Sequence, residues 1–484
     1  MWWSSLVPST YSVMEMGYLD YGGGTRPPIA GHGMAGHGMT GHGMAGMSGT
    51  GHGNGGESRS VTDLDTDPDR PADVTVDLTA RQQRFTLPTG EEIDGYTLNG
   101  SSPGPLITAT VGELVEVHLH NASVPDGVTL HWHGVDVPNA EDGVAGVTQD
   151  AVPVGGDFTY RFVVPHAGTF WYHSHQVSHD QVVGGLLGPL VVQPRHRDTS
   201  VRDVVALAHL YGGAETVNGH AGHLQVDAEP GEQVRLRVIN TDNGPLEIWS
   251  GEPLTLVATD GYDVHGPTPF TGRTVDVPAG GRADVLVAVA DGGTRVQLTG
   301  DVSVVLGPDG ARPPSVEQPE RWLDRLHYGT PEATPLMRAK ADRSFRYDIG
   351  HRLGFVDGRP GLQWSINGHL FPDLPMFVVE EGDVVRIRIS NHSGDVHPMH
   401  LHGHHAVVLD RDGDAVSGSP WWVDSLDVRN GETYDIAFLA DNPGIWMDHC
   451  HNLTHAAQGM VTHLMYAGVT EPFRIGGGAG NEPE

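Results

Sequence analysis

The chain has 484 residues, of which 61 are acidic and 28 basic, so its formal net charge is −33. This charge argues against a nucleic acid or an anionic membrane as partner and favours solubility and the attraction of cations. The length suggests about three domains, and the 67 glycines and 34 prolines indicate a loop-rich protein built from β-strands. No apolar run in the sequence is long enough to predict a transmembrane helix. The single cysteine, Cys450, excludes intrachain disulfides.

Residues 1–67 form a Gly-, His- and Met-rich segment without hydrophobic periodicity, and we predict that it is flexible. From Gly31 a five-residue repeat runs three times, each copy beginning Gly-His-Gly-Met. Imidazole and thioether groups together suit copper, especially Cu(I). Weak copper capture and a simple linker produced by repeat slippage both remain open as interpretations.

From about residue 70 the sequence alternates apolar and polar residues in short runs between turn residues, a pattern typical of β-strands. One strand signature, which opens on Gly and an acidic residue and closes on Asn, occurs at 112–121, 231–240 and 382–391. Three copies of one β-sandwich explain this repetition, so the predicted fold class is all-β. We place the domains at residues 68–198, 199–310 and 341–472, with a linker at 311–340 and a tail at 473–484.

Four histidine-paired segments occur in the first and third domains and none at the corresponding places of the second. Residues two apart on a strand point to the same face, so each pair presents two imidazoles together. The eight imidazoles, here called the inner cluster, predict a buried site for several copper ions between the first and third domains. They belong to His131, His133, His173, His175, His400, His402, His449 and His451. By contrast, the lone pair His118 and His120 is interpreted as a surface pair.

Cys450 lies between two residues of the inner cluster and must therefore point to the opposite face of its strand. His397 has the opposite parity to His400, and His455 and Met460 follow Cys450 on the next loop. A Cys thiolate, two imidazoles and a weak Met thioether are the ligands of a blue-copper electron-transfer site. His397, Cys450, His455 and Met460, here called the outer site, are thus joined to the inner cluster through very few bonds.

These segments resemble the four copper motifs of the multicopper oxidases, as found in three-domain bacterial laccases and cuprous oxidases, over roughly residues 70–470. The resemblance implies three consecutive cupredoxin-like Greek-key domains and four copper ions per chain. It assigns the type 1 copper to the outer site, with Met460 axial, and the type 2 copper to His131 and His400. It assigns one type 3 copper to His133, His173 and His451, and the other to His175, His402 and His449. The implied reaction is one-electron oxidation at the type 1 copper, coupled to reduction of O2 to water at the trinuclear cluster.

The resemblance also points to the proton supply and to the electron entry. Asp142 matches an acidic residue that relatives keep near the cluster, and its alternative interpretation is an ordinary turn residue. Ala456 stands where many relatives carry a second acid, so the second proton donor is not predicted. Asp395 lies close enough in sequence to flank the outer site, where it could hold a cation, accept a phenol proton or be a plain surface residue.

Three functions fit these features. The first is a laccase-type oxidase of phenols and similar one-electron donors. The second is a metallo-oxidase of Cu(I), or of Fe(II) or Mn(II), in copper tolerance, and the third is a copper-buffering protein that uses the N-terminal repeats. One chain supplies every ligand, so a monomer is sufficient. Relatives of this kind are exported, so we expect a secreted or cell-surface protein whose leader or anchor is missing from this sequence.

Overall fold

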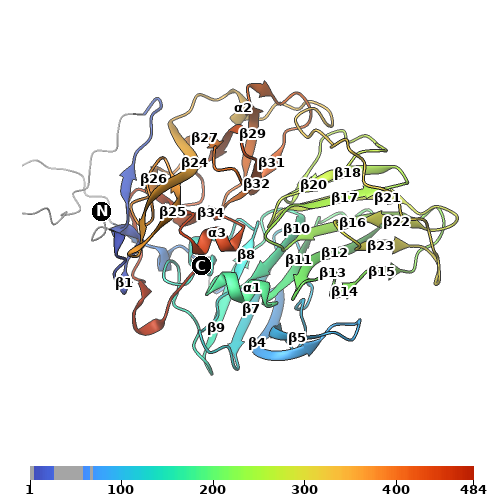
Figure 1. Ribbon diagram of the computed structural model, residues 1–484, viewed down its shortest axis with the longest axis horizontal. Coiled ribbons are helices and arrows are strands. Elements are labelled where there is room, and N and C mark those ends of the chain that lie inside the picture. Colours follow the sequence, from blue (N-terminus) through green and yellow to red (C-terminus); the bar gives the residue numbers. More distant parts are fainter. Residues whose placement is uncertain (1–4, 27–57, 66–68) are drawn as a thin grey trace, which may run out of the picture.

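The structure, a computed structural model, describes residues 5–26, 58–65 and 69–484 and is nearly all β, as predicted (Figure 1). The strands gather along the chain into three pairs of sheets. None of the helices among the described residues is long and apolar enough to cross a membrane. The predicted domain boundaries stay a prediction, and the repeats that start at Gly31 lie outside the described residues.

The first pair of sheets packs around a core that contains Trp132, Phe162 and Leu190, all fully buried. The first sheet has the order β5 (Glu92–Leu98), β4 (Val74–Thr86), β7 (Leu114–Asn121), β9 (Asp157–Val163). The second has the order β6 (Ile107–Thr110), β11 (Leu187–Gln193), β10 (Gly168–His173), β8 (His131–His133). On β7, alternation buries one face and leaves His118 and His120 on the other, where they contact carboxylates, so their interpretation as surface residues is confirmed.

The second pair of sheets has its own core, formed by Val, Leu and Ile side chains. Its larger sheet has the order β14 (His220–Ala221), β13 (Ala214–Val217), β12 (Val201–Tyr211), β16 (Gln233–Asn240), β21 (Arg282–Ala288), β18 (Leu254–Thr259), β19 (Tyr262–Asp263). The smaller has the order β15 (His223–Val226), β23 (Ser303–Leu306), β22 (Thr294–Gln297), β17 (Leu246–Ser250), β20 (Val275–Val277).

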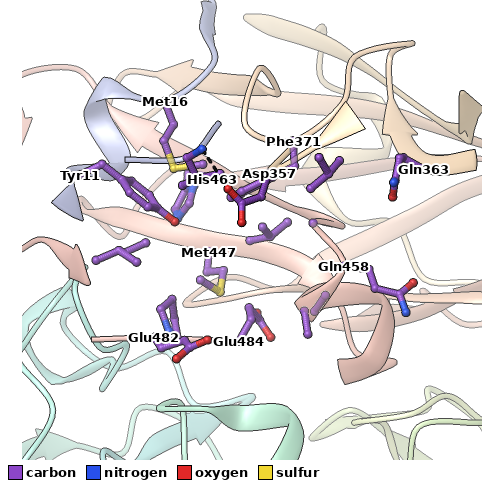
Figure 2. A pocket seen from close by; sticks show the side chains of 18 of the residues that line it. Tyr11, Met16, Asp357, Gln363, Phe371, Met447, Gln458, His463, Glu482 and Glu484 are labelled. Atoms are coloured by element: carbon purple, nitrogen blue, oxygen red, sulfur yellow. Dashed lines mark hydrogen bonds between the residues drawn. The ribbon is translucent and has the colours of Figure 1, made fainter. Parts of the chain in front are cut away.

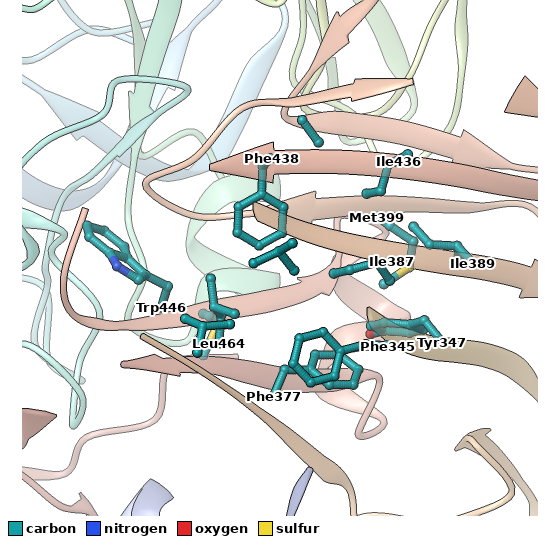
Figure 3. Packing of buried hydrophobic residues seen from close by; sticks show 14 of the residues in the cluster. Phe345, Tyr347, Phe377, Ile387, Ile389, Met399, Ile436, Phe438, Trp446 and Leu464 are labelled. Carbon is teal, nitrogen blue, oxygen red and sulfur yellow. The ribbon is translucent and has the colours of Figure 1, made fainter. Parts of the chain in front are cut away.

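The third pair of sheets encloses a core rich in aromatic residues, in which Phe345 and Phe438 face Phe377 and Trp446 (Figure 3). One sheet has the order β2 (Tyr18–Asp20), β26 (Pro375–Val379), β35 (Val461–Tyr466), β34 (Ile445–Cys450), β28 (His397–Leu401), β32 (Ser425–Val428). The other has the order β25 (Arg359–Ile366), β24 (Arg343–Val356), β27 (Val384–Asn391), β33 (Thr433–Leu439), β29 (Ala406–Arg411), β30 (Asp414–Ala415), and β31 (Trp422–Val423) pairs with β29.

Helices are few and short. The α-helices are α1 (Ser178–Val183), α2 (Pro335–Arg338) and α3 (Leu453–Ala457). The 3-10 helices are η2 (Val13–Glu15), η3 (Val61–Asp63), η4 (Asn139–Glu141) and η5 (Gly477–Ala479). The helix α3 follows Cys450 directly and is capped by the side chain of Asn452, which accepts a hydrogen bond from the His455 N–H. This cap holds the loop that carries His455 against the end of β34.

The prediction that residues 1–67 are flexible and have no core was wrong for residues 5–26 and 58–65. Strand β2 adds to the edge of β26, and Val13 is fully buried in the third core. Strand β1 (Thr10–Tyr11) pairs with β37 (Ile475–Gly476), and β3 (Arg59–Ser60) pairs with β36 (Val469–Thr470). The physical reason is that strands of two or three residues obtain their hydrogen bonds from edges that other segments provide, without any periodicity of their own.

Candidate metal centres

Strand pairing brings the predicted histidine pairs together. In the first domain His131 is paired with His173 across β8 and β10, and in the third domain His400 is paired with His449 across β28 and β34. The two sets meet face to face, because the rings of His131 and His402 stack 3.8 Å apart and those of His133 and His400 also lie 3.8 Å apart. All eight imidazoles of the inner cluster are at most 1% exposed.

The hydrogen bonds of the inner cluster orient its ring nitrogens. In most of the eight rings Nδ1 contacts a carbonyl or carboxylate oxygen, for example the Ser174 carbonyl at 2.9 Å from His173 and the Asp424 carbonyl at 2.8 Å from His400. Nδ1 therefore carries the proton and Nε2 is left with a lone pair. The buried Nε2 atoms of His131, His173, His175 and His400 have no hydrogen-bond partner among the described residues. Such an arrangement is typical of metal ligands.

Two rings depart from this pattern. Neither nitrogen of His451 has a hydrogen-bond partner among the described residues, whereas His133 has its Nε2 3.1 Å from Ser425 Oγ and its Nδ1 without a partner there. The opposite nitrogen of this ring is therefore the one that faces the cluster. Burial lowers the pKa of His173 to about 3 and holds the pKa values of most other rings well below their usual range. Neutral imidazole is the form that binds a metal.

Chemically, the inner cluster fits metal ions better than any internal pairing of its side chains. The nitrogens of His175, His402 and His449 lie within 4.8 Å of one another, and His402 Nε2 is 3.3 Å from His449 Nε2. Two nitrogens whose lone pairs face each other repel unless a cation lies between them. Buried polar atoms without partners destabilise a fold, which a bound metal would relieve.

The outer site lies on the other face of β34. Cys450 Sγ is 3.6 Å from His397 Nδ1 and 3.7 Å from His455 Nδ1. A metal held about 2.0–2.3 Å from each atom in a trigonal plane would separate sulfur and nitrogen by about 3.7 Å. Burial raises the pKa of the Cys450 thiol, so a thiolate there needs a bound cation. Met460 is fully buried, and its carbonyl accepts a hydrogen bond from the Cys450 N–H.

Two further side chains orient the outer site. Ser393 Oγ lies 2.7 Å from His397 Nε2, which leaves Nδ1 facing the sulfur. The Trp364 ring packs against the His455 ring at 4.6 Å. Asp395 is exposed and close enough for its charge to act on His455.

Asp142 reaches two rings of the inner cluster. Its carboxylate lies 3.1 Å from His402 Nδ1 and 3.1 Å from His131 Nδ1, and its carbonyl accepts from His131 at 3.0 Å. The side chain is 1% exposed. This carboxylate is thus in contact with the cluster rather than in a solvated turn.

Comparison with known proteins agrees with this geometry. Residues 79–197 and 347–468 match two sequence profiles that are each described as multicopper oxidase. The chain belongs to the multicopper oxidase family. It is 28% identical to multicopper oxidase MmcO of Mycobacterium tuberculosis, over 81% of this chain and 87% of that protein. It is 27% identical to Laccase-1 of Botryotinia fuckeliana, over 76% of this chain and 77% of that protein.

Among solved structures, the multicopper oxidase of Pseudomonas thermotolerans superposes with a TM-score of 0.66 at 27% identity, covering 82% of this chain and all of that one. The three-sandwich architecture is therefore the cupredoxin-like fold of this family. A copper-dependent oxidase is the activity that the family carries.

In this multicopper oxidase, a buried ion pair between the second and third domains lies behind the inner cluster. The Arg282 guanidinium donates to both carboxylate oxygens of Asp424 at 2.6 Å, and Asp424 lies 3.2 Å from His133 Nε2. Arg282 and Asp424 were not predicted, because a single charged residue among apolar ones does not signal its distant partner in the sequence. The second domain is thus more than a spacer, since it sets the orientation of His133 through this pair.

The C-terminal residues also contact the cluster, although the sequence placed them in a featureless tail. The His175 Nδ1–H donates to the Pro483 carbonyl at 3.0 Å, and Glu484 Oε1 lies 3.3 Å from His449 Nδ1. Burial raises the pKa of Glu484 to about 8. A cavity of about 460 Å³ adjoins these residues, and Figure 2 shows Glu482 and Glu484 on one side of it. Nothing in the periodicity of residues 473–484 signals this position.

Gly280 of the second domain touches two rings of the cluster directly. A Cβ at Gly280 would lie 2.7 Å from His133 Cε1 and 2.9 Å from the His451 ring, and the residue has φ of +79°. We expect Gly280→Ala to displace both imidazoles and to lower the copper content of the purified protein by about one ion or more per chain, read by elemental analysis. The Tm should fall as well.

The matched control is Gly231→Ala. Gly231 has φ of +85°, and no atom lies within 4 Å of the place that a Cβ would occupy there. The substitution has the same backbone strain, of about 1–2 kcal/mol, without the contact to the rings. Gly231→Ala should lower the Tm and keep full copper content. Equal copper loss in both variants would contradict the steric argument.

Proposed function

We propose that this protein is a laccase-type multicopper oxidase that oxidises phenolic or similar one-electron donors at the outer site and reduces O2 to water at the inner cluster. In this assignment His397, Cys450, His455 and Met460 would hold a type 1 copper. The inner cluster would hold three more ions. His131 and His400 would bind a type 2 copper. His133, His173 and His451 would bind one type 3 copper, and His175, His402 and His449 would bind the other.

The observation that carries this proposal is the alternation of side chains along β34. His449 and His451 face the inner cluster, whereas Cys450 between them faces His397 and His455. Copper ions bound at these places would supply one-electron redox chemistry and the four-electron reduction of O2. The backbone of three consecutive residues then connects the two centres, which favours rapid electron transfer. A protein that only stores copper has no need for this connection.

The remaining steps rest on the chain's own side chains. The half-buried His455 ring is the part of the outer site nearest to solvent, so we assign it as the entry for electrons. Asp142 is assigned to the proton supply of the inner cluster, since its carboxylate contacts His402 and His131. Asp395 beside His455 would accept a phenol proton or hold a cationic donor.

A metallo-oxidase acting on Cu(I), Fe(II) or Mn(II) is the alternative, favoured by the His- and Met-rich repeats from Gly31. Copper buffering by those repeats alone would leave the inner cluster without a role. An extracytoplasmic location also belongs to this proposal and rests on the resemblance alone.

Steady-state O2 uptake distinguishes the two substrate classes. We expect the full chain to take up O2 with a phenol such as 2,6-dimethoxyphenol. Replacing residues 27–57 by a Gly-Ser linker of equal length should leave the phenol rate within about twofold, because the contacts described at the outer site come from Trp364, Ser393, His397, Cys450 and His455. Keeping residues 5–26 preserves the pairing of β2 with β26.

The same two proteins are then assayed with Cu(I) under conditions that suppress its spontaneous oxidation. A Cu(I) rate that exceeds the phenol rate and collapses in the linker variant would replace the laccase assignment by the metallo-oxidase alternative. If the copper-loaded protein takes up no O2 with any donor, both the laccase and the metallo-oxidase assignments are wrong.

A further inference from the structure

The hairpin formed by β24 and β25 is held rigidly beside the outer site. Its turn consists of Asp357 and Gly358, both with positive φ, which is the two-residue turn that matches the twist of paired strands. The N–H groups of both turn residues donate to Ser5, to its carbonyl at 2.8 Å and its Oγ at 3.2 Å. The far end of the hairpin is thus anchored to the N-terminal segment.

One face of this hairpin carries a ladder of three cross-strand pairs. The pairs are Ile349 with Ile366, His351 with Trp364, and Leu353 with Leu362. Directly paired residues share a face, and so do residues two apart, so all six side chains lie on the same side. The first pair is 1% exposed and belongs to the core, whereas Leu353 is 80% exposed and Leu362 61%. The ladder therefore runs from the core into solvent.

The middle pair of the ladder covers the outer site. The Trp364 ring lies 4.6 Å from the His455 ring and 5.0 Å from the His397 ring, so one indole touches both imidazoles that flank Cys450. On its other side Trp364 stacks on His351 at 4.1 Å with 26° between the planes. Its Nε1–H donates to Gln458 Oε1 at 2.9 Å, which fixes the ring.

Leu353 and Leu362 differ from other exposed apolar residues by their position as well as by their exposure. Single exposed apolar side chains are common on protein surfaces and need no explanation. Leu353 and Leu362, however, are opposite each other, one pair beyond the ring that covers the electron entry. The opposite face of the hairpin is different, since Arg359 and Gln363 there line the cavity of Figure 2. On the ladder face the two leucines continue directly from the indole that covers the outer site.

We propose that Leu353, Leu362 and Trp364 form the binding face for an uncharged planar aromatic donor, and that its electron reaches His455 and His397 across the indole. The proposal rests on the laccase-type function above and names the substrate class of that site. Each donor molecule, a phenol, loses one electron to the outer site and its hydroxyl proton to solvent, directly or by way of the Asp395 carboxylate, and leaves as a phenoxyl radical. Four such events supply the four electrons that, with four protons, reduce one O2 to two waters.

This face would not select a small hydrophilic donor. Ferrocyanide, a multiply charged anion, gains nothing from two leucines, and a bare metal ion finds no ligand atom on either of them. Trp364 has a positioning role in this proposal, because its indole would lie between the donor and the two imidazoles without forming or breaking a bond. We therefore expect the contribution of this face to be measured by the ratio of kcat/KM for a phenol to kcat/KM for ferrocyanide.

The test uses the copper-loaded full chain and the double variant Leu353→Ser/Leu362→Ser. Because both side chains are exposed, the variant should fold normally. We expect the KM for 2,6-dimethoxyphenol to rise about tenfold, with a smaller change in kcat, and the phenol-to-ferrocyanide ratio of kcat/KM to fall by a similar factor. Leu210→Ser, at a 41% exposed leucine of β12 in the second domain, is the matched control and should leave phenol kinetics unaltered.

Trp364 is tested with two variants, since it touches the outer site. Trp364→Ala should lower the phenol-to-ferrocyanide ratio, and Trp364→Phe, which keeps a ring, should restore most of it. The visible absorption of both variants reports whether the copper site is intact. An unchanged phenol KM in the double variant would overturn the proposal, as would an equal loss of phenol and ferrocyanide activity. If the wild type oxidises ferrocyanide but no phenol, the laccase assignment itself fails.

Discussion

Cys450→Ser is expected to abolish the intense visible absorption and the oxidase activity while leaving most of the inner copper bound. The thiolate is the soft ligand of the outer site, and a serine hydroxyl neither ionises nor binds copper comparably at neutral pH. Cys450 is also the side chain through which the outer site connects to His449 and His451. Its loss therefore removes both the electron acceptor and the connection.

The inner cluster should survive because its ligands come from other side chains and from two domains. Removing Sγ leaves the Cys450 backbone in place, where its N–H donates to the Met460 carbonyl and its carbonyl accepts from His449. Copper content should fall from about four to about three ions per chain by elemental analysis. Turnover with phenol or ferrocyanide should drop to background.

Met460→Leu is the comparison variant, because it removes the thioether that we assign as a weak copper ligand and keeps the thiolate. It should stay coloured and active, with a raised potential of the outer site. Persistence of the blue absorption in Cys450→Ser would refute the assignment of the outer site. Loss of all copper in that variant would show instead that the two centres load as one unit.

Much of both centres could be predicted from sequence because strand geometry converts spacing into direction. A His two residues from another His shares its face, and a Cys between them does not. This parity alone placed His449 and His451 apart from Cys450, and the structure brings Cys450 to His397 and His455. The same rule could not find Trp364, since an aromatic residue on a strand is most often part of a core.

Contacts between domains could not be predicted from the periodicity of the sequence. Arg282 and Asp424 are 142 residues apart; Arg282 is the first residue of β21 and Asp424 lies between β31 and β32, and neither position signals the other in the sequence. The terminal segments failed for a related reason, because β1, β2 and β37 are too short to show alternation and depend on edges elsewhere. What the sequence could not supply was thus the set of partners that only the assembled domains provide.

Asp142→Asn is expected to slow O2 reduction by about 100-fold or more while leaving the outer site unaffected. The carboxylate accepts from the His402 Nδ1–H and lies 3.1 Å from His131 Nδ1, and an amide can neither carry a proton to the inner cluster nor accept equally well. In stopped-flow experiments, anaerobic bleaching of the blue colour by a phenol should keep its rate. Recovery of the colour after mixing with O2 should become slow, so that kcat falls.

The neighbouring Glu141→Gln separates a specific role for Asp142 from a general loss of acidity. Glu141 accepts from the Arg161 N–H, and burial raises its pKa to about 8, so it is mostly protonated at pH 7. In Glu141→Gln an amide then replaces an already neutral acid. The rate of anaerobic bleaching and the rate of colour recovery with O2 should therefore both stay near those of the wild type. Cys450→Ser should abolish the blue absorption, whereas Asp142→Asn should slow only the return of that absorption after mixing with O2. Together these two results would assign electron entry to the outer site and oxygen reduction to the inner cluster, on the other face of β34. Fast recovery of the colour in Asp142→Asn would remove Asp142 from the proton supply and direct attention to Glu484, whose carboxyl lies beside His449.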